Sequence, residues 1–134
     1  MTKTTSHYLT ALAVLVTLAA LSALMMAVAP GNADAATKAK TTLTIKAEGI
    51  DLSGTVESKK LSCLGNRKVK VYKQVGTEQS PKTDPVVASD TSERQGDHGV
   101  WSTGNTGKSG KFYARTGGTP ECTGDTSETI VARR

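Results

Sequence analysis

The feature that most constrains this chain is an alternating segment that begins just after one of its two cysteines. Cys63 is followed by a Gly-Asn turn and then by Arg67 and an extended run. Val69 and Val71 point to one side of such a run. The residues that alternate with them point to the opposite side, toward solvent: Lys68, Lys70 and Tyr72. This period of two predicts a β-strand with one buried and one exposed face.

The same alternation recurs along the rest of the chain. We expect strands over residues 42–47, 50–56, 68–75, 86–89, 100–102, 111–116 and 126–132, with Gly54 as a bulge or a close approach. No segment after residue 35 keeps apolar residues at helical spacing, because Gly or Pro interrupts each candidate. About seven short strands separated by turns predict an all-β fold, a single antiparallel β-sandwich. The expected core, with Trp101 covering one end, is Leu43, Ile45, Leu52, Val56, Val69, Val71, Val86, Val100, Phe112, Ala114 and Ile130.

The two cysteines allow one intramolecular disulfide, between Cys63 and Cys122. This bond would join the first half of the domain to its last strand and stabilise it by about 4 kcal/mol through loop closure. A zinc site is the competing interpretation of a cysteine pair. The chain has no Cys-x-x-Cys motif, and its only histidine after residue 35, His98, cannot complete a set of four zinc ligands. The sequence therefore predicts a disulfide, no metal site and no cofactor.

The first 35 residues have the pattern of a secretory signal peptide, which is helical before it is removed. A basic start is followed by an uncharged apolar run over residues 9–28, and Ala33-Asp34-Ala35 supplies a small-x-small cleavage site. We expect cleavage after Ala35 and therefore a secreted, extracellular protein. The alternative is an uncleaved membrane anchor, because the apolar run reaches the ~20 residues that span a bilayer.

Three segments follow from this reading: a signal peptide at 1–35, a flexible lead-in at 36–41 and a β-sandwich domain at 42–134. The predicted leader holds one lysine and one aspartate, so the net charge of +5 stays with the remaining domain. A domain of this size with few bulky apolar residues has a thin core. We expect a monomer, without stable membrane association after cleavage, in which the disulfide supplements that core.

Several short motifs together resemble a known class of domain. They are Ser53-Gly54-Thr55-Val56, Gly65-Asn66-Arg67 with Val69-x-Val71-Tyr72, Ser89-Asp90-Thr91, Gly99-Val100-Trp101 and Gly110-Lys111-Phe112-Tyr113-Ala114, with Cys63, Cys122 and Ser127. The chain is similar in these motifs to small exported bacterial β-sandwich modules related to carboxypeptidase regulatory-like, or transthyretin-like (prealbumin-like), domains. The resemblance covers about residues 50–131. It implies an Ig-like seven-strand sandwich with a disulfide and no active site of its own.

Catalytic constellations are weakly represented. His98 could serve a small secreted hydrolase with a loop serine, but no Gly-x-Ser-x-Gly elbow is present. Lys73 falls on the apolar side of its strand, so it either reaches the domain edge and extends to water or forms a buried isopeptide crosslink. We therefore expect a non-catalytic protein with no catalytic residues, and keep the His98 hydrolase as the alternative.

Basic residues are concentrated around Cys63. Lys59, Lys60, Arg67, Lys68 and Lys70 fall within twelve residues and could contact an anionic surface. Nucleic acid is not an expected ligand, since the few aromatic residues are not interleaved with the lysines as a stacking platform requires. The sequence thus favours a binding or structural module at the cell surface. Its expected partner is an anionic surface polymer or another exported protein.

Overall fold

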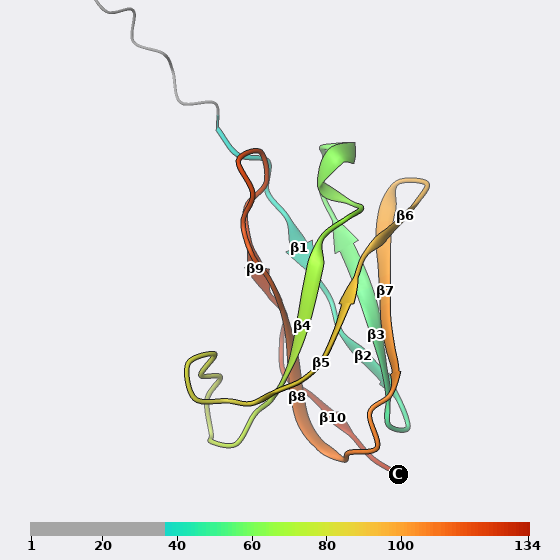
Figure 1. Cartoon of the computed structure of the whole chain (residues 1–134), viewed down its shortest axis with the longest axis vertical. Helices are drawn as coiled ribbons and strands as arrows, with labels where there is room; N and C mark the ends of the chain where they lie inside the picture. The colour runs from blue at the N-terminus through green and yellow to red at the C-terminus, as the bar shows by residue number, and fades with distance from the viewer. Residues whose placement is uncertain (1–36) are drawn as a thin grey trace, which may run out of the picture. The chain divides into compact units, whose positions relative to one another are not determined.

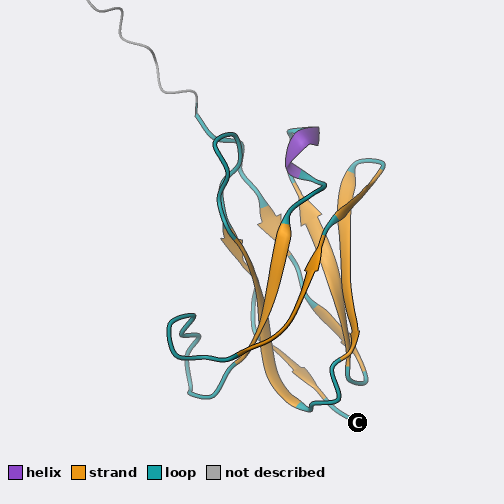
Figure 2. Ribbon diagram, viewed as in Figure 1, coloured by secondary structure: helices purple, strands orange, loops and turns teal. Residues whose placement is uncertain are grey.

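The structure, a computed structural model, describes residues 37–134. The predicted signal peptide and the alternative membrane anchor lie outside the described residues. Residues 37–134 form two five-stranded antiparallel sheets that face each other (Figures 1 and 2). Within this range, no helix is long and apolar enough to cross a membrane.

One sheet has the strand order β1-β3-β7-β6, with β2 also paired to β3, and the other has the order β10-β8-β4-β5, with β9 also paired to β8. The elements are β1 (Thr42–Leu43), β2 (Lys46–Glu48), β3 (Asp51–Glu57), a short 3-10 turn η1 (Leu61–Cys63), β4 (Lys68–Lys73), β5 (Val86–Thr91), β6 (Glu93–Gln95), β7 (His98–Asn105), β8 (Gly110–Thr116), β9 (Asp125–Thr126) and β10 (Ile130–Ala132). The predicted all-β antiparallel fold is confirmed. Ten strands replace about seven because the first and last predicted strands are each divided in two and the 93–99 turn region contains β6.

The division between β1 and β2 occurs where Thr44 passes over Gly54. The Thr44 hydroxyl accepts a hydrogen bond from the Thr55 backbone N–H at 2.9 Å, in a position that a strand carbonyl would normally occupy. The Thr44 carbonyl lies instead so close to Gly54 that a Cβ there would overlap it. The expected close approach at Gly54 is therefore confirmed.

The core lies between the two sheets and contains most of the expected residues. Its fully packed members are Leu43, Leu52, Val56, Val69, Val71, Trp101, Phe112, Ala114 and Ala132, with Ile45 and Ile130 partly buried against them. Trp101 is an interior residue rather than a cover, because its register partner Gly54 leaves room for the indole. Val100, predicted inside, consequently lies on the outer face of β7 opposite Thr55.

The placement of Val86 in the core was also wrong. β4 and β5 shift register between Val71 and Tyr72, so Val71 pairs with Ala88 while Tyr72 pairs with Val86. The extra residue at this irregularity moves Val86 to the outer side of the sheet, where its side chain is 49% exposed.

Two aspartates connect the sheets across the open sides of the sandwich. Asp125, on β9, accepts a hydrogen bond from the Leu43 backbone N–H of β1 at 2.7 Å. Asp90, on β5, accepts one from the Ser102 backbone N–H of β7, also at 2.7 Å. The Leu43 N–H belongs to the edge strand β1, and the Ser102 N–H lies on β7 beyond the residues that pair with β6, so each carboxylate satisfies a donor on an open side of the sheet.

Candidate functional site

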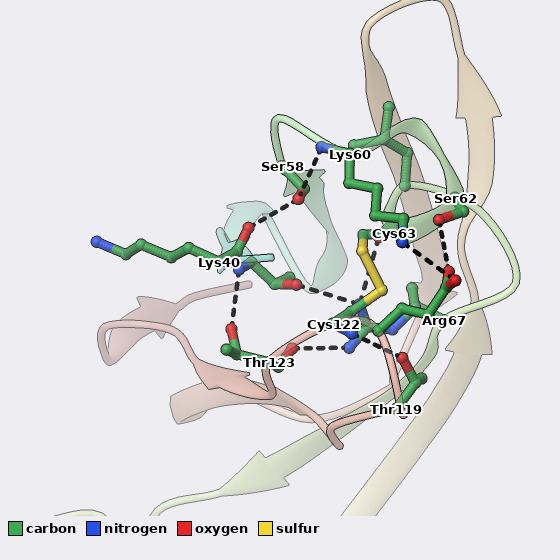
Figure 3. Close-up of a disulfide and its surroundings, with 12 residues drawn as sticks. Lys40, Ser58, Lys60, Ser62, Cys63, Arg67, Thr119, Cys122 and Thr123 are labelled. Atoms are coloured by element: carbon green, nitrogen blue, oxygen red, sulfur yellow. Dashed lines mark hydrogen bonds and ion pairs between the residues drawn. A yellow bond between two sulfur atoms is a disulfide. The ribbon is translucent and has the colours of Figure 1, made fainter. Parts of the chain in front are cut away.

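The predicted disulfide between Cys63 and Cys122 is present, with Cα atoms 5.8 Å apart (Figure 3). Cys63 ends η1, and Cys122 lies in the loop between β8 and β9. Ala39 pairs with Cys122 in a parallel bridge, so the chain entering the domain is fastened to the same loop. The two sulfurs thus join the connection after β3 to the segment that precedes β9.

The five predicted basic contact residues separate into different environments around this disulfide. Lys60 pairs with Glu121 at 3.1 Å, and the lysine and Ser62 together lower the pKa of that carboxyl group. Lys59 lines a groove on the sheet that contains β3 and β7. Only Lys68 and Lys70 remain together, exposed on the outer face of β4.

Arg67 does not belong to the exposed surface, and its assignment as an anion contact was wrong. It is 3% exposed, and its guanidinium donates to the Thr41 hydroxyl at 3.1 Å and to three backbone carbonyls. Those carbonyls belong to Cys63 (3.4 Å), Gly117 (2.6 Å) and Thr123 (3.0 Å). Burial lowers the pKa of Arg67, but a guanidinium stays protonated in proteins. The charge of Arg67 is therefore used to fix loops around the disulfide.

The outer face of β4 gains a third cation from β8. Arg115 lies directly opposite Lys70 in the β4–β8 register, and Lys68 lies two residues before Lys70 on the same side of β4. We call these three exposed residues the cationic face: Lys68, Lys70 and Arg115. Hydroxyl side chains flank the cationic face on both sides. On β5, Ser89 pairs with Lys70 and Thr91 pairs with Lys68. On β9, Thr126 pairs with Arg115.

No residue of the cationic face forms an ion pair within the described part of the chain. The ion pairs found within residues 37–134 are Lys46–Glu48, Lys60–Glu121 and His98–Asp97, and none includes a member of this face. Like charges placed directly opposite each other across a sheet are unfavourable. The Lys70–Arg115 pair therefore gives this part of the surface a positive potential that the fold does not require.

Two tyrosines lie next to the cationic face, beneath the loop between β4 and β5. Tyr72 was predicted to face solvent, but it is 8% exposed and stacks on Tyr113 with ring centroids 5.2 Å apart. Asp84 holds the loop in place, since its carboxylate accepts hydrogen bonds from the Val75 and Ser80 N–H groups and the Tyr113 hydroxyl. These backbone bonds lower the pKa of Asp84, while burial and the nearby carboxylate raise that of Tyr113 to about 12.

His98 lies in a separate groove of about 840 Å³ on the outer face of the other sheet, lined also by Lys40, Lys59 and Asp97. Its Nδ1 is 2.9 Å from the Asp97 carboxylate, which lowers the pKa of Asp97. The groove also contains Ser58, whose hydroxyl donates to the Lys40 carbonyl at 2.7 Å. Within residues 37–134, no serine hydroxyl is hydrogen-bonded to His98 and no three His, Cys, Asp or Glu side chains could hold a metal ion.

Lys73 ends β4 and is half-buried. Its side chain lies beside Gly110 at the margin of the sheet, where a Cβ on that glycine would be 3.4 Å from the Lys73 Cε. A position at the strand end agrees with the edge interpretation of this lysine and gives no support to a buried crosslink.

Arg115 is the surface residue that the sequence analysis missed. It lies far from Lys70 in sequence, and only the pairing of β4 with β8 brings the two together. Arg115 follows the expected core residue Ala114 and so falls on an outward position of its strand, but no signal in the sequence pairs that strand with the strand of Lys70. A scan against protein-family models and a search of curated proteins each found no match to this chain.

Proposed function

We propose that this protein is an exported, non-catalytic β-sandwich module that binds an anionic polymer at the cell surface through its cationic face. The observation that carries the proposal is the Lys70–Arg115 pair, two exposed cations in direct register with Lys68 beside them. An anion that contacts both side chains would relieve their mutual repulsion on binding. The hydroxyl-bearing neighbours on β5 and β9 offer additional hydrogen-bond donors at the same level of the sheet.

The disulfide and the N-terminal sequence pattern support export. Disulfides persist in oxidising compartments, and the pattern of residues 1–35 is that of a cleaved leader. The two antiparallel sheets are compatible with an Ig-like or transthyretin-like sandwich of the accessory type. Modules of that type carry no active site, which agrees with a binding role.

The test is retention of the purified protein by isolated anionic cell wall. Electrostatic contact should hold the protein at low salt and release it at high salt, because the Debye length falls from ~10 Å at 0.1 M to ~3 Å at 1 M. The triple variant Lys68→Gln, Lys70→Gln, Arg115→Gln should remain in the supernatant. The matched control is Lys38→Gln, Lys40→Gln, Lys59→Gln, which removes the same charge from exposed positions elsewhere.

The control variant should sediment like the wild type if the cationic face is the site. Equal loss of retention in the two variants would reduce the effect to net charge and contradict the proposal. Failure of the wild-type protein to sediment at low salt would contradict it as well.

A further inference from the structure

A small hollow of about 440 Å³ adjoins the cationic face where β8 ends. Glycine backbone forms much of its wall, and the side chain of Arg115 borders it. Its lining residues are Arg115, Thr116, Gly117, Gly118, Gly124, Asp125 and Thr126. The hollow therefore brings uncovered backbone next to an unpaired cation.

The fold does not require glycine at position 117. Gly117 has no left-handed backbone conformation, and a Cβ added there would meet nothing within 4 Å. Gly124 differs, because its Cβ would lie 2.8 Å from the Thr116 carbonyl oxygen. Glycine at 124 thus has a packing reason, whereas glycine at 117 only keeps space open above the sheet.

The open space at Gly117 is bordered by the cationic face. Continuing the β4–β8 register by one residue past Val69–Thr116 places Lys68 opposite Gly117, while Lys70 is opposite Arg115. Asp125 pairs with Thr116 and is thus on the other side of the sheet from Arg115, with its carboxylate bonded to the Leu43 N–H. On the outer side, Arg115 and Thr126 line the hollow itself, while Lys68 and Lys70 lie across from Gly117 and Arg115 on β4.

Arg67 fixes the backbone beneath this space from the interior. Its Nη2 donates to the Gly117 carbonyl at 2.6 Å and to the Thr123 carbonyl at 3.0 Å. The two chain segments that border the hollow are thereby held at a fixed separation. A preformed site loses less conformational entropy on binding than one that must be ordered by its ligand.

We propose that this hollow binds one phosphodiester group of the anionic ligand, with Arg115 and Lys70 on its non-bridging oxygens. This inference rests on the proposed function and names the ligand chemistry for the same face. A planar carboxylate can be satisfied by one guanidinium, whereas the oxygens of a tetrahedral phosphate diverge and can contact donors on two strands. The missing side chain at Gly117 gives such a group room to approach the sheet.

The test compares two soluble polymers at equal charge, poly(glycerol phosphate) and polygalacturonate, by titration against the purified full-length protein. The phosphodiester polymer should bind at least about tenfold more tightly, the scale of one additional charge-assisted hydrogen bond. Gly117→Val should remove this preference while leaving the unfolding midpoint unchanged. Gly76→Val is the matched control, because Gly76 also has an ordinary backbone conformation and a Cβ there would meet only the Glu78 backbone, at 3.8 Å.

Arg115→Lys keeps the charge but loses the two-pronged donor that suits a planar carboxylate, so it should weaken polygalacturonate binding more than phosphodiester binding. Equal affinity for the two polymers, or an unchanged preference in Gly117→Val, would overturn the phosphodiester site while leaving anionic binding intact. Binding of neither polymer would instead overturn the proposed function. Vesicles containing phosphatidylglycerol form a further arm, and Gly117-dependent binding to them would support the same chemistry with a lipid headgroup as its source.

Discussion

The disulfide end of the sandwich and the outer face of β4 and β8 both concentrate positive charge, but the two regions use it differently. At the disulfide end, Arg67 donates to four oxygen atoms and Lys60 pairs with Glu121. On the outer face, Lys70 and Arg115 oppose each other, and neither forms an ion pair with an acidic residue of the described chain. Nearness in sequence therefore says less about a shared role than the partner of each charge does.

Among the variants that compare these two regions, removal of the disulfide should cause the largest loss of stability. We expect Cys63→Ala, Cys122→Ala to lower the free energy of unfolding by about 4 kcal/mol, since the bond closes a loop with a sequence separation of 59. Urea unfolding measures this loss. Under conditions where the variant remains folded, it should still bind wall polymer. Loss of binding without unfolding would contradict the assignment of stability and binding to separate regions.

Replacing Arg67 should have the next largest effect. Arg67→Met leaves buried carbonyls without a donor, each at a cost of about 1–3 kcal/mol, so we expect roughly 3 kcal/mol of destabilisation. Thermal unfolding followed by circular dichroism tests this value. Arg115→Met, which removes an exposed guanidinium, should change the unfolding midpoint very little. Similar losses in the two variants would contradict the assignment of one arginine to the fold and the other to binding.

Asp84 should make a smaller, pH-dependent contribution to stability. Its pKa is lowered in the folded state, so its contribution is present above the ordinary aspartate pKa of about 4 and is lost as pH falls through the folded-state value. Asp84→Asn should unfold more easily than the wild type at neutral pH, and this difference should shrink in acid. A difference in unfolding midpoint that is independent of pH would contradict the role of the ionised carboxylate.

The smallest effect on stability is expected from the cationic face itself. The triple Gln variant of Lys68, Lys70 and Arg115 should change the free energy of unfolding by no more than about 0.5 kcal/mol, because these side chains are exposed and form no ion pair within residues 37–134. Relief of the Lys70–Arg115 repulsion could even raise it. Chemical denaturation of the variant beside the wild type measures the change, and a loss above 1 kcal/mol would make the face structural.

Alternation and turn residues were enough to predict the antiparallel all-β fold and the close approach at Gly54, and the pair of cysteines was enough to predict the disulfide. They failed where the chain departs from regular pairing. Which of Trp101 and Val100 faces the core depends on Gly54, the residue across the sheet from Trp101. The exposure of Val86 depends on the register shift beside Val71.

The candidate site was only half predictable for the same reason. Arg67 is a separate case: it lies in phase with Val69 and Val71, so the alternation itself places it on the buried side, and only its positive charge led to its assignment to the surface. Tyr72 does share a side of β4 with Lys70, but the loop held by Asp84 covers it. Arg115 joins the lysines only through long-range pairing, which a single sequence does not specify.

The most direct test of the central claim is to map the bound polymer by backbone amide chemical shifts. Poly(glycerol phosphate) is titrated into isotope-labelled protein, and the shifted amides are assigned. The account predicts that the largest changes cluster at Lys68, Lys70, Arg115 and Gly117 and that they fade as salt is raised. Changes centred instead on the groove of Lys40, Lys59 and His98 would contradict it.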